Sequence, residues 1–183
     1  MHASSCASQA AAAEVPVSLM HGDMRDFDLG QRFALVIVSC NSLAHLTGND
    51  DLLSCFRAVE RHLAPGGLLA FDITNPRLRE LAGADAPFEG PSTSGAITMS
   101  EALSYDPVHQ LRISEWSVAG PSHEAREFAP LVLRQIFPQE LPLLLGAAGL
   151  ELAARYGDFD GNALAGDSLN QVCLARATHA PAS

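Results

Sequence analysis

Residues 59–76 read VERHLAPGGLLAFDITNP, and this stretch decides the fold. It starts inside a helix predicted over about 50–63, where apolar residues recur every three or four positions. The Pro-Gly-Gly at 65–67 ends that helix and leads into a buried strand over 68–72. Upstream, residues 33–39 (FALVIVS) form an apolar run with no polar alternate, which is typical of a parallel strand buried on both faces. Strand, helix and strand at this length predict a right-handed βαβ crossover in a parallel sheet.

Further strands are predicted on both sides of this crossover. Residues 15–21 alternate apolar and polar side chains ahead of a Gly-Asp turn, which predicts a short first strand. Near the C-terminus a helix is predicted to end at Gly149, because a glycine fits the left-handed cap. Its regular part is expected to begin at Pro142 or a few residues earlier. Two more strands are predicted near 150–156 and 170–176.

The middle of the chain has the pattern of an antiparallel flap. Two extended segments, 97–105 and 110–118, follow one another around an Asp-Pro turn. A third extended segment over about 126–134 is expected to join them, with Pro130 at an edge or a bulge. The sequence therefore predicts a flap over about 96–134, inserted in an α/β frame.

This organisation predicts one domain with a tail. A loop rich in Gly, Pro and Ser spans 83–95 and leads into the flap. The first 14 residues are rich in Ala and Ser and of low complexity. We therefore expect a tail over 1–14 and an α/β domain over 15–178 that carries the flap.

The composition excludes several classes of partner and mechanism. The 183 residues include 21 acidic and 11 basic ones, a net charge of −10, so the field of the chain repels nucleic acid. Every basic residue is arginine, and the absence of lysine excludes Schiff-base catalysis and a phosphate-loop lysine. The four cysteines lie far apart and the seven histidines show no HxxxH or HxH spacing, so no metal site is expected. Since no apolar run reaches membrane length and no signal-peptide pattern occurs, we expect a cytoplasmic protein with no membrane partner.

Candidate ligand-binding residues follow the predicted strands, because open α/β sheets bind ligands beyond the carboxyl ends of their strands. Asp23 and Met24 follow the first strand, the turn 40–42 follows the second, and residues 72–75 follow the third. The carboxylate of Asp23 could accept a hydrogen bond from an exocyclic amine while the next backbone N–H donates to a ring nitrogen, a pattern that suits adenine. The alternative for Asp23 is an ordinary surface aspartate at a strand end.

Four segments together carry a resemblance to a known family. They are HGDMRDFDL, FALVIVSCNSLAHL, VERHLAPGGLLAFDITNP and FPQELPLLLGAAGLELAARYGDFDG, in that order. This succession resembles the class I S-adenosylmethionine-dependent methyltransferases, from their third strand to the end, and covers nearly the whole chain from about residue 15. The resemblance implies a Rossmann-like sheet that contains only strands 3 to 7 of the family, with an inserted antiparallel flap.

The resemblance also implies a cofactor, S-adenosylmethionine, and residues that contact it. Asp23 matches the acid of the family that contacts adenine, and Met24 matches the residue whose backbone N–H faces the adenine ring. Ser39, Cys40 and Asn41 match the turn that flanks the methionine part of the cofactor and faces the acceptor. The alternative for these three is a tight strand-to-helix turn with no ligand.

Candidate residues for catalysis and for the acceptor are less sharply defined. His45 lies near the turn and is the candidate base, although a capping or core histidine would show the same pattern. Tyr105, Trp116 and Arg134 match the flap that covers the acceptor in similar proteins. Core side chains are the alternative for the two aromatics, and a surface ion pair is the alternative for Arg134.

One departure from the family affects both fold and function. Family members begin with a strand and a glycine-rich turn of the form ExGxGxG, followed by a second strand whose terminal acid binds ribose, and neither motif occurs in this sequence. The family sheet has the order 3-2-1-4-5-7-6, so strands 3 and 4 lose the neighbours between them. Strand 3 is then expected either to pair directly with strand 4 or to leave an apolar sheet edge that invites self-association. We expect either a misplaced start or a true truncation.

The sequence thus predicts S-adenosylmethionine-dependent methyl transfer to a small-molecule acceptor by a truncated member of the family. The alternative is a catalytically inactive remnant or interaction module that keeps the fold. A short-chain dehydrogenase, which also places a GDxxD-like segment after its third strand, would need a Tyr-x-x-x-Lys pair. Without lysine, that chemistry is excluded.

Overall fold

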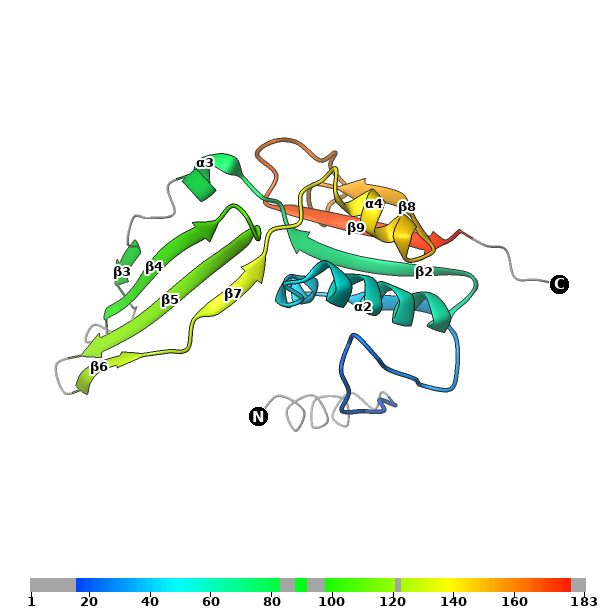
Figure 1. Cartoon of the computed structure of the whole chain (residues 1–183), viewed down its shortest axis with the longest axis horizontal. Helices are drawn as coiled ribbons and strands as arrows, with labels where there is room; N and C mark the ends of the chain where they lie inside the picture. Colours follow the sequence, from blue (N-terminus) through cyan, green and yellow to red (C-terminus); the bar gives the residue numbers. More distant parts are fainter. Residues whose placement is uncertain (1–15, 83–87, 92–97, 121–122, 179–183) are drawn as a thin grey trace.

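The computed structural model describes residues 16–82, 88–91, 98–120 and 123–178, and the predicted tail over 1–14 lies outside these ranges. These residues form two sheets: one belongs to an α/β unit, and the other forms an antiparallel flap that extends away from that unit (Figure 1). The α/β unit contains β1 (Phe33–Val38), η1 (Ser42–His45), α2 (Asn49–His62), β2 (Leu63–Thr74), α3 (Leu78–Ala82), α4 (Leu141–Ala147), β8 (Leu150–Tyr156) and β9 (Asn170–Ala177). The flap contains β3 (Phe88–Pro91), β4 (Thr98–Asp106), β5 (Leu111–Gly120), β6 (His123–Glu127) and β7 (Leu131–Arg134).

The sheet of the α/β unit has the strand order β1-β2-β9-β8. β1 pairs with β2 in parallel and α2 connects them, so the predicted βαβ crossover is confirmed. β9 pairs with β2 and with β8 in antiparallel fashion. This order is the 4-5-7-6 half of the sheet that the resemblance implies.

One face of this sheet carries the core. α2 and α4 contact each other on that face and cover alternate residues of β2 and β9. Phe56 of α2 is fully buried, and its ring centroid lies 6.1 Å from that of Phe71 in β2. Leu145 of α4 and Leu150 at the start of β8 are also fully buried. The apolar residues that recur every three or four positions over 50–63 therefore form the face that α2 buries.

The opposite face and the free edge of β1 are open. Leu35 is 49 % exposed and Ile37 is 64 % exposed, and they share this face with their cross-strand partners Leu68 and Ala70. In the described part of the chain, no strand pairs with β1 on the side away from β2. The predicted strand over 15–21 is wrong, since residues 16–21 have no regular secondary structure. A strand needs a neighbouring strand for its backbone hydrogen bonds. In the family, the first two strands of the sheet lie between this segment and the strand that corresponds to β1, and the sequence contains neither of their motifs.

The flap has more strands than the sequence predicts. β4 and β5 correspond to the two predicted segments and pair along their whole length. The third predicted segment is split in two, because Pro130 interrupts it between β6 and β7. β3 lies in the segment 83–95 that was predicted to be a loop. It was not predicted because two of its four residues are Gly and Pro, which are uncommon in strands.

Prolines and glycines set the other boundaries as expected. α4 begins at Leu141 with a proline in its first turn, and Gly149 after its end has a φ of 79°. The short α3 and the 3-10 helix η1 were not predicted, since each is too short to show a helical period. No helix in the described ranges combines the length and the apolar character needed to cross a membrane.

Gly67 predicts a measurable packing effect. A Cβ at this position would lie 2.7 Å from the backbone oxygen of Phe33 and 2.9 Å from that of Ala64. We expect Gly67→Ala to lower the free energy of unfolding by about 2 kcal/mol in urea denaturation, because two backbone segments must separate. Gly146→Ala is the matched control: nothing lies within 4 Å of its Cβ, and within a helix the change should raise stability slightly. Equal stability of the Gly67→Ala variant and the parent chain would contradict the close approach.

Candidate active site

The segment that carries Asp23 is fixed to α2 by a buried histidine. The backbone N–H of Leu29 donates to Nε2 of His62 at 2.9 Å, so Nδ1 carries the ring proton and donates to the backbone oxygen of Ala58 at 2.7 Å. The ring of Phe27 stacks against His62 with a centroid distance of 4.7 Å. The segment is therefore held in place although it forms no strand.

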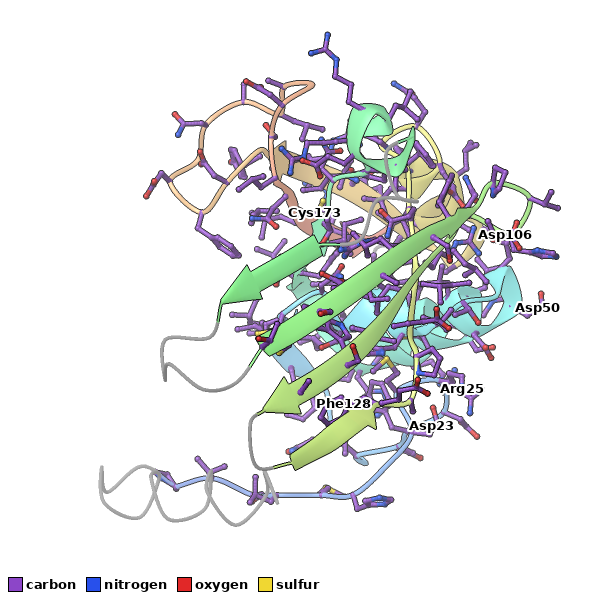
Figure 2. The ribbon with its side chains drawn as sticks, turned by 90° about the vertical axis from the view of Figure 1, so that its left-hand side faces the viewer. Asp23, Arg25, Asp50, Asp106, Phe128 and Cys173 are labelled. Carbon is purple, nitrogen blue, oxygen red and sulfur yellow. The ribbon has the colours of Figure 1, made fainter. Side chains whose placement is uncertain are left out.

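Asp23 is an ionised carboxylate in this position. Arg25 donates to it from Nη2 at 2.6 Å and from its backbone N–H at 2.9 Å, and also reaches Asp51 of α2 at 3.1 Å. Figure 2 shows Asp23 and Arg25 lying together on the segment that precedes β1. The hydrogen bonds from Arg25 lower the pKa of Asp23 to about 2. Nε of Arg25 also donates to both carboxylate oxygens, at 3.0 and 3.1 Å, and half of the side chain stays exposed to a ligand.

A cavity of about 550 Å³ brings three of the predicted residues together. Asp23, Met24 and His45 line it, along with Arg25 and Asp51. Met24 is half-buried and also contacts the core. His45 therefore lies beside the two residues predicted to hold the adenine ring, and its part as a base stays a prediction.

The turn after β1 has an unusual backbone held by a carboxylate. Cys40 and Asn41 have φ values of 60° and 56°, in the left-handed region that non-glycine residues seldom occupy. Asp72 of β2 accepts from the N–H of Cys40 at 2.8 Å through Oδ1 and from that of Asn41 at 3.0 Å through Oδ2. In return, Asn41 Oδ1 accepts from the N–H of Thr74 at 3.0 Å. These bonds offset a strain of about 1 kcal/mol or more per residue.

Asp72 belongs to the candidate segment 72–75, but its part as a positioning residue was not predicted. Its contacts join residues more than 30 positions apart in sequence, so no local pattern reports them. The only available signal was a carboxylate at the end of a buried strand. Ser39 begins the same turn, and its backbone oxygen accepts from the hydroxyl of Ser42 at 2.6 Å.

The flap places two predicted acceptor residues on one of its faces. Tyr105 pairs with Arg112 and Trp116 with Glu101 across β4 and β5, and cross-strand partners share a face. Burial raises the pKa of Tyr105 and the charge of Asp106 adds to it, so the phenol stays protonated. Trp116 lines its own cavity of about 370 Å³ and not the one that contains Asp23.

Arg134 has a different environment from the other two. Its guanidinium is 6 % exposed, pairs with Glu140 ahead of α4, and lies 3.4 Å from the backbone oxygen of Thr47. Its cross-strand partner is Leu111, on the face of β5 that does not carry Trp116. Arg134 therefore lies at the joint between flap and α/β unit, and its part in the acceptor site stays a prediction.

The residues present fit the adenine end of S-adenosylmethionine. An ionised acceptor, Asp23, and a half-buried apolar residue, Met24, stand at one cavity, as an amino-substituted aromatic ring requires. The sequence contains no glycine-rich turn for the amino-acid end or acid for the ribose. The residues of this chain therefore fit the adenine end of the cofactor, whereas the sequence shows no motif for its amino-acid end or its ribose.

Comparisons with known proteins identify the family of the chain. The family model described as "Methyltransferase domain" matches residues 2–71. The solved CcbJ methyltransferase from Streptomyces caelestis is 31 % identical, with a TM-score of 0.82 over 94 % of this chain and 69 % of its own. The cypemycin N-terminal methyltransferase of a Streptomyces species is 27 % identical over 150 residues, 79 % of this chain and 58 % of its own length.

A third relative is more similar over a shorter span. The dTDP-4-amino-2,3,4,6-tetradeoxy-D-glucose N,N-dimethyltransferase of Saccharopolyspora spinosa is 42 % identical over 59 residues, 32 % of this chain and 23 % of its own length. The matches thus cover between about a quarter and three fifths of these curated relatives. With the CcbJ likeness, the strand order and the Asp23–Met24 cavity, this chain belongs to the class I S-adenosylmethionine-dependent methyltransferase family.

Proposed function

We propose that this chain serves S-adenosylmethionine-dependent methyl transfer to an amino nitrogen of a small molecule. The observation that carries the proposal is the braced turn at the end of β1, beside the cavity of Asp23 and Met24. The names of two relatives support nitrogen as the accepting atom, since one describes dimethylation of an amino sugar and the other methylation of a peptide N-terminus.

The proposed chemistry needs orientation more than acid–base groups. When bound, the cofactor supplies an electrophilic methyl group on a sulfonium; a new C–N bond forms as the C–S bond breaks, and the nitrogen then releases a proton to solvent. A neutral amine carries its own lone pair, so a base is not required before attack. The role of the chain is to fix the two reactants in line, which supplies much of the rate of such reactions.

Each residue then has a defined part. Asp23 and the backbone of Met24 would hold the adenine ring, and His45 would close the same cavity. The turn of Ser39, Cys40 and Asn41 would flank the methionine part, with its shape fixed by Asp72.

Matched acceptors test the proposal. The purified chain is incubated with S-adenosylmethionine and an amino sugar or the same sugar with a hydroxyl at that carbon, and products are analysed by mass spectrometry. We expect methylation of the amino sugar alone, because a neutral hydroxyl is a far weaker nucleophile without a base. Methylation of the hydroxy sugar at an equal or higher rate would contradict nitrogen as the acceptor.

The second candidate is an interaction module without catalysis. The open edge of β1 and the exposed Leu35 and Ile37 favour it, because an unpaired apolar edge strand is a template for a second chain. We propose a second copy of this chain as that partner. A chain that sediments as a dimer and binds no S-adenosylmethionine would favour this candidate over the enzyme.

A further inference from the structure

A cavity of about 860 Å³ lies beyond the carboxyl end of β2. Its walls come from α3, from the link between β7 and α4, from the end of β8 and from the loop between β8 and β9. The volume is in the range of small-molecule sites, about 300–1,000 Å³. Ligands of open α/β sheets bind at this edge. Of the candidate residues named from the sequence, only Asn75 lines it.

The charges in this cavity are opposite to those of the chain as a whole. Arg77, Arg79 and Arg155 line it, three of the 11 arginines, against Glu80 and Asp167, two of the 21 acidic residues. The groove beside Asp23 also contains three arginines, but three aspartates balance them. The cavity at β2 is thus a local positive site on a chain of net charge −10.

The three arginines keep donors for a ligand. Arg77 pairs with Glu80, and Nη1 of Arg155 donates to the backbone oxygen of Pro138 at 2.6 Å. A guanidinium has five N–H donors, so one bond leaves most of them. Arg79 is exposed at the mouth. The planar guanidinium group of an arginine can donate two parallel hydrogen bonds to two oxygens of one phosphate.

The cavity lies one residue along the chain from a hydrogen bond that holds the turn of the cofactor site. The N–H of Thr74 donates to Asn41 in that turn, and the next residue, Asn75, lines the cavity. Asn75 is 5 % exposed and fixes the β8–β9 loop, because its N–H donates to Leu169 at 2.9 Å and its side-chain Nδ2 to Ser168 at 3.0 Å. Its side-chain oxygen has no hydrogen-bond partner among the described residues. One acceptor molecule could therefore reach both places.

We propose that this cavity binds a phosphate or diphosphate group on the methyl acceptor, with Arg77, Arg79 and Arg155 as the anion ligands. The inference rests on the proposed function, because it names the class of acceptor. An anionic group in the cavity would leave the remainder of the acceptor beside the turn at Asn41. Because the chain as a whole has a net charge of −10, a local positive site of this kind favours acceptors that carry an anionic group.

Titration calorimetry with inorganic pyrophosphate, in the absence of S-adenosylmethionine, tests the site on its own. We expect saturable binding by the full chain. Arg79→Gln and Arg155→Gln should each weaken it by about tenfold, the usual effect of losing a charge-assisted hydrogen bond. Arg176→Gln is the matched control: this exposed arginine of β9 pairs with Glu151 outside the cavity, and its loss should leave affinity unchanged.

The outcomes separate this site from the methyl-transfer proposal. Absence of saturable pyrophosphate binding overturns the site, and so does equal weakening by Arg176→Gln, which would indicate a general charge effect. Arg155→Gln also loses the bond to Pro138, so thermal unfolding of each variant is measured in parallel. Arg79 makes no such bond to any described residue, and unchanged binding by a folded Arg79→Gln chain overturns its role. Failure of methyl transfer with intact pyrophosphate binding would contradict only the proposed function.

Discussion

Replacing Asp72 with asparagine is expected to weaken S-adenosylmethionine binding by about tenfold or more and to lower the free energy of unfolding by about 1–3 kcal/mol. An asparagine offers one oxygen where the carboxylate offers two, and its NH₂ group would face a backbone N–H of Cys40 or Asn41. With that partner lost, the two residues are no longer held at φ values of 60° and 56°. Titration calorimetry and urea denaturation measure the two effects.

An aspartate in a loop provides the control. Asp158 accepts from the backbone N–H groups of Asp160 and Asn162, both at 3.0 Å, in the exposed loop after β8. Asp158→Asn should lower stability without changing cofactor affinity, since the hydrogen bonds of Asp158 stay within residues 158–162. Full cofactor affinity in the Asp72→Asn chain would show that the brace does not shape the binding turn.

Replacing Arg134 with methionine is expected to cost about 3 kcal/mol of unfolding free energy, because it leaves Glu140 without its cation in a largely buried position. Arg134 is 6 % exposed and Glu140 has 21 % of its side chain exposed. Trp116 is the only tryptophan and lies on β5 of the flap, so its fluorescence follows flap unfolding, whereas far-UV circular dichroism follows the whole chain. We expect the fluorescence transition to move to a lower denaturant concentration than the circular dichroism transition, because the lost ion pair joins the flap to the α/β unit.

Two further variants make this result specific. Arg176→Met removes an exposed ion pair, which typically contributes about 0–1 kcal/mol. The double variant Arg134→Met, Glu140→Leu should recover part of the loss, since no buried charge is left unpaired. Unchanged stability of Arg134→Met, together with a raised KM for the acceptor, would instead restore Arg134 to the acceptor site.

The sequence predicted the parts of the fold that depend on local pattern. The apolar period of α2 and the unbroken run of β1 each act over a few residues, so the crossover could be predicted. The Pro-Gly-Gly at 65–67 follows the end of α2 but lies within β2, which begins at Leu63 and not at the predicted residue 68. The strand over 15–21 was predicted wrongly because its pattern depends on neighbours absent from the sequence. β3 was missed because its strand pairing comes from β4 and not from its own composition.

The candidate site was predictable to a smaller extent. The resemblance identified Asp23 and Met24, and the structure places them in one cavity with His45. Asp72 could not be assigned, because its partners come from another strand. The cavity at the end of β2 combines residues from 75 to 167, and only the fold brings these segments together.

Titration of S-adenosylmethionine into the purified chain tests the central claim most directly. We predict saturable binding at one site per chain, weakened by about tenfold in Asp23→Asn, because a hydrogen bond to a charged group is lost. Asp50→Asn, the same change at the exposed start of α2 and outside the cavity, should bind as the parent chain does. Absence of saturable binding by the folded parent chain, or equal affinity in the Asp23→Asn chain, would contradict the account.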